Sequence, residues 1–173
     1  MAQMKIPLLN EQSFSDLAYG PIIARFQQSA PVDVVRMAEA LGLRVWELSD
    51  LPAHISGKLF KDETNGGPSG YSIGVNAKEA FVRKRFTVAH EIAHFILHRN
   101  RIKTELVDDT MYRSGLVSSA EEVEANKMAA FILMPLSLVK QLMDTGIKDV
   151  DMLAQILQVS GAAMRIRLGV PVV

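Results

Sequence analysis

Two histidines and a glutamate at fixed spacing are the residues of this chain best suited to do chemistry. His90 and His94 are four residues apart, and Glu91 directly follows the first histidine. On a helix this spacing puts both imidazoles on one face, where they supply half of a tetrahedral zinc site. Glu91 is turned by about 100° from His90 and can reach a water molecule at the metal from the side. The pattern indicates metal-assisted hydrolysis with Glu91 as general base, since the ion acidifies that water and polarises a carbonyl.

The flanks of this motif favour a metal site over the competing interpretation, a surface helix whose histidines are satisfied without metal. A polar trio inside an apolar helix is costly to bury without partners, and a metal ion is one such partner. The surrounding apolar residues are Phe86, Val88, Ala89, Ile92, Ala93, Phe95, Ile96 and Leu97.

Four motifs in order carry a family resemblance. They are Arg85-Phe86-Thr87-x-Ala89-His90-Glu91-x-x-His94, Leu97-His98, Glu122-x-Glu124-Ala125-Asn126-x-x-Ala129 and Leu133-Met134-Pro135. Together they resemble the ImmA/IrrE family of zinc metallopeptidases, over a stretch from about Val32 to Leu168. The family comprises bacterial and phage regulators that typically act with a helix-turn-helix repressor and cleave it. The resemblance therefore implies a zinc-dependent endopeptidase with one Zn²⁺ per chain and a protein substrate, a DNA-binding repressor encoded nearby.

The resemblance also implies the third metal ligand, Glu122, three residues before Ala125. Asn126 follows at i+4, where thermolysin-like proteases carry a residue that orients a ligand histidine, so it is expected to accept an imidazole N–H. Glu121 and Glu124 remain rivals for the ligand role, although Glu124 faces away from Glu122 on a helix. Ser118 with Glu121 is expected to cap this helix.

For other residues near the His90–His94 motif, the sequence gives less support to a specific role. Asn100 to Ser118 is polar and aperiodic, which predicts a long loop near the cleft. Tyr112 and Arg113 in this loop are candidates to stabilise an oxyanion. His98 is expected to be a structural histidine, favoured by the dipole near the helix end, because a fourth protein ligand would close the position that catalysis needs.

The predicted fold is α+β and gluzincin-like, with a small antiparallel sheet of about three strands packed on helices that include the motif helix. Alternation and turn residues predict strands at Leu43–Leu48, Ile55–Phe60 and Tyr71–Val75, the last a possible edge strand that binds substrate. Helices are predicted at 21–28 and 31–41, from a capping box of Asn76 and Glu79 to His98, from Ser118 or Ser119 to near Pro135, and at 136–143.

Residues 1–173 are predicted to form a single metallopeptidase domain, with a core at 30–146 and a helical tail at 147–173. The first ten residues are expected to be mobile. Val150 to Gly169 resembles a helix-turn-helix, with Ser160 as the cap of its second helix and Arg165 and Arg167 as possible phosphate contacts. That second helix offers little to read base edges, so direct nucleic-acid binding is not favoured.

Composition excludes several classes of protein. Lys plus Arg and Asp plus Glu are 19 each, so no global charge favours nucleic acid or membrane, and 49% hydrophobic residues suffice for a core. The absence of cysteine excludes disulfides and thiol chemistry. Met1 to Asp16 lacks a signal-peptide pattern, and the longest apolar stretch, Met128 to Val139, is too short to span a membrane. We expect a soluble, cytoplasmic protein.

Two alternatives to the peptidase remain. One is a non-catalytic metal-binding regulatory module that binds a repressor or DNA and uses the metal for structure. The other is a transcription factor that contacts DNA through its C-terminal helices.

Overall fold

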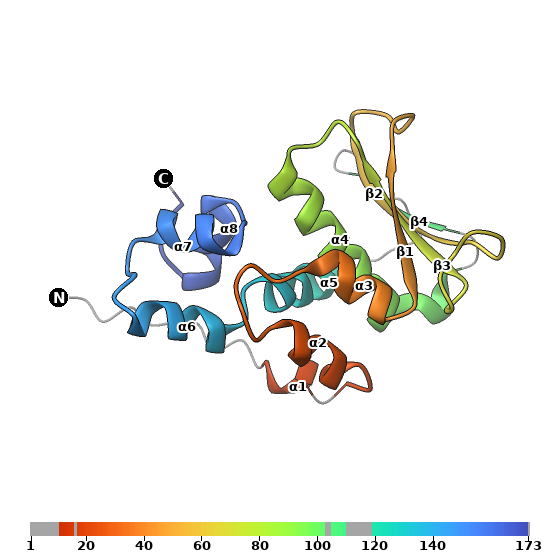
Figure 1. The fold of residues 1–173 in the computed structure, drawn as a ribbon. Coiled ribbons are helices and arrows are strands. Elements are labelled where there is room, and N and C mark those ends of the chain that lie inside the picture. Colours follow the sequence, from red (N-terminus) through yellow and green to blue (C-terminus); the bar gives the residue numbers. More distant parts are fainter. Residues whose placement is uncertain (1–10, 16, 103–104, 110–118, 173) are drawn as a thin grey trace.

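The computed structural model describes residues 11–15, 17–102, 105–109 and 119–172. Its helices are α1 (Gln12–Ser15), α2 (Gly20–Phe26), α3 (Val34–Ala40), α4 (Phe81–His98), α5 (Ser119–Leu133), α6 (Leu136–Asp144), α7 (Val150–Leu157) and α8 (Gly161–Leu168), with a short 3-10 helix η1 (Arg99–Arg101). Its strands are β1 (Leu43–Leu48), β2 (Ile55–Lys61), β3 (Tyr71–Asn76) and β4 (Glu105–Asp109). Figure 1 shows the sheet at one side of the molecule and α7 and α8 at the other, with α4 between them.

The α+β fold class is confirmed, and the three predicted strands occur within one residue of their predicted ends. The strand order is β1-β3-β2-β4, with β2 antiparallel to both of its neighbours and β1 parallel to β3, so the sheet is mixed and the prediction of an antiparallel sheet is wrong for the β1–β3 pair. The prediction of Tyr71–Val75 as an edge strand is wrong, because β3 is hydrogen-bonded on both sides and cannot accept a further strand. The prediction of one long loop over 100–118 is also wrong, since η1 and β4 lie within it.

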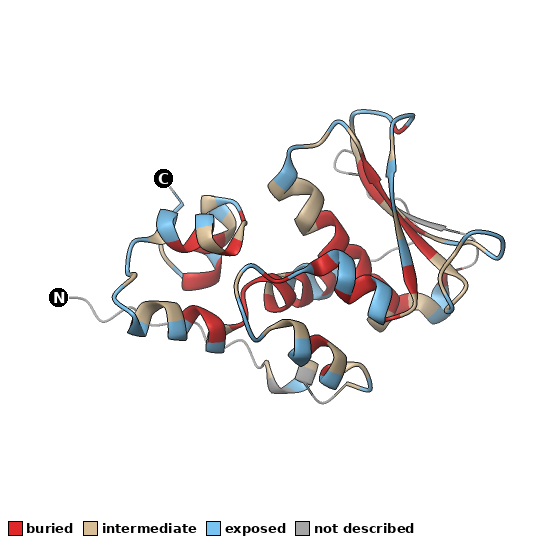
Figure 2. Cartoon of the chain, in the orientation of Figure 1, coloured by how far each residue is buried: buried red, intermediate tan, exposed pale blue. Residues whose placement is uncertain are grey.

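Helix α4 is the element that the core is built around. It packs against α5 and α3 and against β2 and β3, and the side chains of Val88, Ile92 and Phe95 are buried. Figure 2 shows continuous burial where α4, α5 and the inner strands meet. The approach of β2 to α4 requires glycine, because a Cβ on Gly57 would lie 2.4 Å from Cγ2 of Thr87. The motif helix is thereby fixed against the sheet.

The start of α4 differs from the prediction. The helix begins after Ala80 without a side-chain cap, so the predicted capping box of Asn76 and Glu79 is wrong. Asn76 instead is buried, donates from Nδ2 to the carbonyl oxygens of Pro52 and Ile55 at 3.0 and 2.8 Å, and accepts from the Lys78 N–H. A local cap pattern was outcompeted by contacts to a distant loop.

The C-terminal helix pair forms as predicted, and Ser160 caps α8 by accepting from the Ala163 N–H at 3.0 Å. Its two arginines are engaged within the protein. Arg167 is 2% exposed, donates from Nε to the Met134 carbonyl at 2.8 Å and forms an ion pair with Glu11. Arg165 pairs with Asp151 at 2.7 Å. The interpretation of both as phosphate contacts is therefore wrong for Arg167, whose guanidinium does not face solvent.

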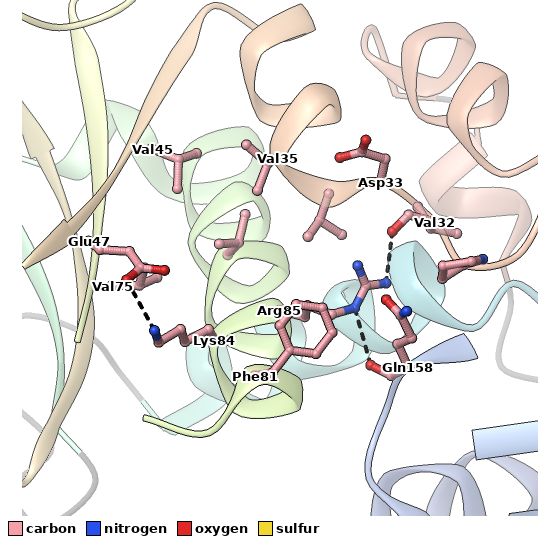
Figure 3. Close-up of a pocket in the computed structure, with 13 residues that line it drawn as sticks. Val32, Asp33, Val35, Val45, Glu47, Val75, Phe81, Lys84, Arg85 and Gln158 are labelled. Carbon is pink, nitrogen blue, oxygen red and sulfur yellow. Dashed lines mark hydrogen bonds and ion pairs between the residues drawn. The ribbon is translucent and has the colours of Figure 1, made fainter. Parts of the chain in front are cut away.

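One arginine of α4 ties three distant segments together. Arg85 donates to the carbonyl oxygens of Val32 at 2.8 Å, Gln158 at 3.1 Å and Leu157 at 3.4 Å. Figure 3 shows Arg85 between Val32 and Gln158, at the wall of a cavity of about 520 Å³ between α3, β1 and α4. Burial lowers the pKa of Arg85, and nearby Asp33 partly opposes that shift. The α7–α8 turn is thus bonded directly to the motif helix.

Candidate metal centre

The structure brings together the three residues expected to hold a metal. His90 and His94 come from adjacent turns of α4, and Glu122 comes from the first turn of α5, which packs across it. Both histidines are 3% exposed, and the Glu122 side chain is 25% exposed. Their potential ligand atoms converge: Nε2 of His90 lies 3.0 Å from Nε2 of His94, and these atoms lie 3.4 and 3.2 Å from the two Glu122 oxygens.

These separations match a tetrahedral zinc site. Two ligand atoms that each lie about 2.0–2.1 Å from zinc at a tetrahedral angle are about 3.3 Å apart. The observed range of 3.0 to 3.4 Å lies around this value. Two imidazoles and one carboxylate also form a donor set that zinc accepts, with a fourth position left for water or substrate. The residues present therefore fit a zinc ion by geometry and by chemistry.

Asn126 orients the first histidine. Its side-chain oxygen lies 3.0 Å from Nδ1 of His90, and an amide oxygen only accepts, so the ring proton lies on Nδ1. The Nε2 lone pair of a neutral His90 then points toward His94 and Glu122. The Phe86 ring stacks on the same imidazole, with centroids 6.2 Å apart. This is the role that the sequence analysis expected of Asn126.

The charge states of the cluster suit a cation. The imidazoles of His90 first and His94 second lie against Glu122 and lower the pKa of its carboxylate, so the carboxylate is ionised near neutral pH. Burial is the main reason that the pKa of His94 is lowered, and it favours the neutral imidazole that a metal needs. An ionised carboxylate that is only partly exposed, placed beside two buried imidazoles, is an environment that attracts a positive ion.

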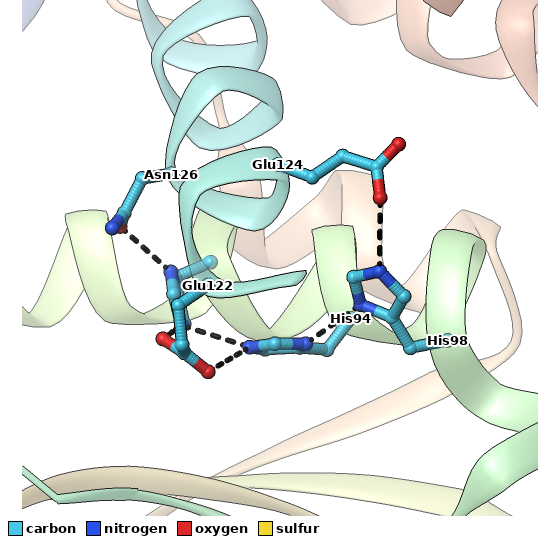
Figure 4. A network of polar contacts seen from close by, with 6 residues as sticks. His94, His98, Glu122, Glu124 and Asn126 are labelled. Carbon is cyan, nitrogen blue, oxygen red and sulfur yellow. Dashed lines mark hydrogen bonds and ion pairs between the residues drawn. The ribbon is translucent and has the colours of Figure 1, made fainter. Parts of the chain in front are cut away.

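A second chain of contacts leaves the cluster on its other side. Nδ1 of His94 lies 3.0 Å from Nδ1 of His98, and Nε2 of His98 lies 3.2 Å from Oε2 of Glu124 (Figure 4). The sequence analysis treated His98 as a helix-end residue and Glu124 as a rival ligand, and it missed this chain. The signal was present in the sequence as a third histidine at another i+4 step. Glu121, the other rival, forms an ion pair with Arg101.

Glu91 directly follows His90 in α4 and is 1% exposed, so its carboxylate is held inside the protein. It is not among the three residues whose ligand atoms converge. The oxyanion candidates Tyr112 and Arg113, and the predicted cap Ser118, lie outside the described residues.

An apolar groove of about 590 Å³ lies near the cluster. Asn126 and Phe86, which contact His90, line it together with Ala163 and Ile166 of α8. Ile166 is 69% exposed. The groove therefore joins the surroundings of His90 to the C-terminal helices.

Comparisons with known proteins agree with this arrangement. The family model described as the IrrE N-terminal-like domain, a peptidase family, matches residues 38–169. Among solved structures, a Mycobacterium tuberculosis transcriptional regulator superimposes with a TM-score of 0.56 at 14% sequence identity. That match covers 92% of this chain and 50% of the regulator, so the chain spans half of that protein's length, and at this identity the likeness shows the fold alone.

No curated protein matches the chain. Among the helices of the described residues, none is both long and apolar enough to cross a membrane.

Proposed function

The chain belongs to the ImmA/IrrE peptidase family, whose IrrE N-terminal-like domain matches residues 38–169, and from this premise we propose that it is a zinc-dependent endopeptidase. The convergence of His90, His94 and Glu122, with atoms 3.0 to 3.4 Å apart, is the observation that carries the proposal. One Zn²⁺ bound there would polarise the substrate carbonyl and lower the pKa of the attacking water.

The chain's own residues would then divide the work. His90, held by Asn126, together with His94 and Glu122 binds the ion. Glu91 accepts the proton of the attacking water and later delivers it to the leaving amine nitrogen. Its burial supports this role, since a carboxylate away from bulk water keeps the proton for the leaving group.

We propose a regulatory DNA-binding protein as the substrate, a helix-turn-helix repressor encoded nearby, and a cytoplasmic site of action. The family supports a peptide substrate. The engagement of Arg165 and Arg167 within the protein argues against direct DNA contact by α8. We also retain the proposal of one domain over residues 1–173, with a core at 30–146 and a tail at 147–173, although Arg85 bonds the two parts together.

Metal content and cleavage test this proposal together. Wild type should bind about one zinc per chain, measured by mass spectrometry, and His94→Ala and Glu122→Ala should lose it. The zinc-loaded wild type should convert the co-encoded repressor into two fragments, while Glu91→Gln keeps the metal and yields only intact repressor. An intact repressor in a stable complex with the wild type would instead favour the non-catalytic regulatory module. Cleavage by Glu91→Gln at the wild-type rate would refute the assigned mechanism.

A further inference from the structure

Two side chains near the cluster, the buried His98 and the exposed Glu124, have no role in the proposed function. His98 is 7% exposed at the end of α4, and its ring lies between His94 and Glu124 of α5. Both of its nitrogens are used: Nδ1 faces His94 at 3.0 Å, and Nε2 faces the carboxylate at 3.2 Å. A histidine placed only to favour the helix dipole would not need a partner on each nitrogen.

The direction of these hydrogen bonds follows from the carboxylate. An ionised carboxylate only accepts, so Nε2 of His98 carries the proton. A neutral His98 then has a lone pair on Nδ1, and this lone pair can only accept from Nδ1–H of His94. With its proton on Nδ1, His94 has its own Nε2 lone pair directed at His90 and Glu122.

The two metal-facing histidines are thus oriented by different devices. His90 has a direct amide acceptor in Asn126, at 3.0 Å. The second imidazole stands one turn further along α4, opposite the start of α5. There the Glu124 carboxylate reaches Nδ1 of His94 only through the His98 ring.

We propose that His98 and Glu124 are positioning residues that hold His94 in the tautomer and orientation needed to bind the metal. This proposal rests on the proposed zinc site and adds a chain of two hydrogen bonds, from His94 to His98 and from His98 to Glu124, that orients one of its ligands. Partners of this kind fix ring orientation and raise ligand basicity, and their loss typically weakens metal binding by about 10–100-fold.

Two substitutions of His98 distinguish this role from simple packing. In His98→Gln the side-chain oxygen can still accept from His94, so zinc affinity should stay close to the wild type. In His98→Leu no acceptor remains, and the zinc dissociation constant should rise by about 10–100-fold in competition with a chromogenic chelator. A packing role predicts the opposite order, because leucine suits a buried site and glutamine does not.

Glu124→Ala keeps the test valid if His98→Leu fails to fold, because the Glu124 side chain is 54% exposed. It should weaken zinc binding in the same direction, though less than His98→Leu. Glu121→Ala, which removes the same charge from the same helix, is the matched control and should leave the affinity unchanged.

Histidine-ring 15N spectra of the zinc-loaded protein supply a readout independent of activity. His94 should show Nδ1 protonated and Nε2 bound to metal, and the Nδ1 proton signal should be lost to solvent exchange in His98→Leu. Wild-type zinc affinity in both His98→Leu and Glu124→Ala would refute the positioning role of His98 and Glu124 and leave the peptidase proposal standing. A wild-type chain that binds no zinc would overturn both.

Discussion

Replacing the two arginines of α8 one at a time should give very different losses of stability, although they are two residues apart. Arg167 is buried, donates to the Met134 carbonyl and pairs with Glu11, which in turn accepts from the Leu136 N–H at the start of α6. Arg165 pairs at the surface with Asp151, whose side chain is 61% exposed. One residue joins three segments, and the other joins two neighbouring helices.

The expected magnitudes follow from these surroundings. Removing one partner of a buried ion pair costs about 3–5 kcal/mol. Because the Glu11 side chain retains 20% exposure, water will take up part of its lost interaction, and we expect about 2–3 kcal/mol for Arg167→Met. Arg165→Met should cost about 0–1 kcal/mol, as for other surface pairs. Burial lowers the pKa of Arg167 to about 10, so this arginine is still charged at neutral pH.

Urea unfolding at pH 7, followed by circular dichroism, measures both free energies of unfolding. In thermal melts the Arg167→Met midpoint should fall by about 4–12 °C, and the Arg165→Met midpoint should move by less than about 4 °C. Equal midpoints for the two variants would refute the conclusion that the buried Arg167 holds α8, Met134 and Glu11 together. Salt-dependent DNA binding that both substitutions weaken equally would restore the transcription-factor interpretation.

Substitutions at three further positions test other parts of the fold. Gly57→Ala should force β2 away from Thr87 and lower the free energy of unfolding by about 1–3 kcal/mol in urea titrations, and an unchanged value would show that α4 is not held so closely to the sheet. Ser160→Ala removes the cap of α8 and should cost about 1 kcal/mol in the same assay, whereas Ser160→Gly should cost only a few tenths. The Asn65 N–H is the main cause of the lowered pKa of Asp62, so that carboxylate adds stability above its unfolded pKa of 3.8 and loses it as the pH falls through the lower folded value. The stability difference between wild type and Asp62→Asn should therefore shrink below pH 3.8 in urea titrations, and a difference that grows on acidification would contradict this sign.

The sequence predicted the strands well because their signal is local. β1 matches its predicted range, since Leu43 and Val45 alternate with polar residues and a glycine precedes them. The order of the strands in the sheet could not be predicted from the sequence. Strands pair through backbone hydrogen bonds, and because almost every residue offers the same backbone groups, the sequence does not show which strands are neighbours. One clue to the central place of β3 was missed: Gly74 leaves the space that Leu48 of β1 fills, since a Cβ there would lie 2.4 Å from Leu48 Cδ1.

The residues of the candidate site were predicted from the sequence in part. Helical spacing and the family motifs were enough to select His90, His94 and Glu122, and the i+4 step selected Asn126. His98 was expected to be a structural histidine near the helix end and not a fourth ligand, and it is not among the residues whose ligand atoms converge. Its contact with the far side of the His94 ring, where Nδ1 needs a partner of its own, was not predicted. Strand β4 was missed because its residues, Glu105 to Asp109, are mostly polar.

The hydrogen bonds of Arg85 cannot all form at the same time while the chain is being synthesised. Its carbonyl partner at Val32 is synthesised before it, but those at Leu157 and Gln158 follow 72 and 73 residues later. At a typical rate of chain elongation, about 4–15 s separate the appearance of the guanidinium from that of its last acceptors. Glu122, the last of the metal-binding residues, follows Arg85 by 37 residues, so the candidate metal ligands are complete about halfway through that interval, while the Arg85 guanidinium still lacks its acceptors at Leu157 and Gln158. The helix with the candidate metal centre is therefore among the last parts of the nascent protein to reach its final bonding.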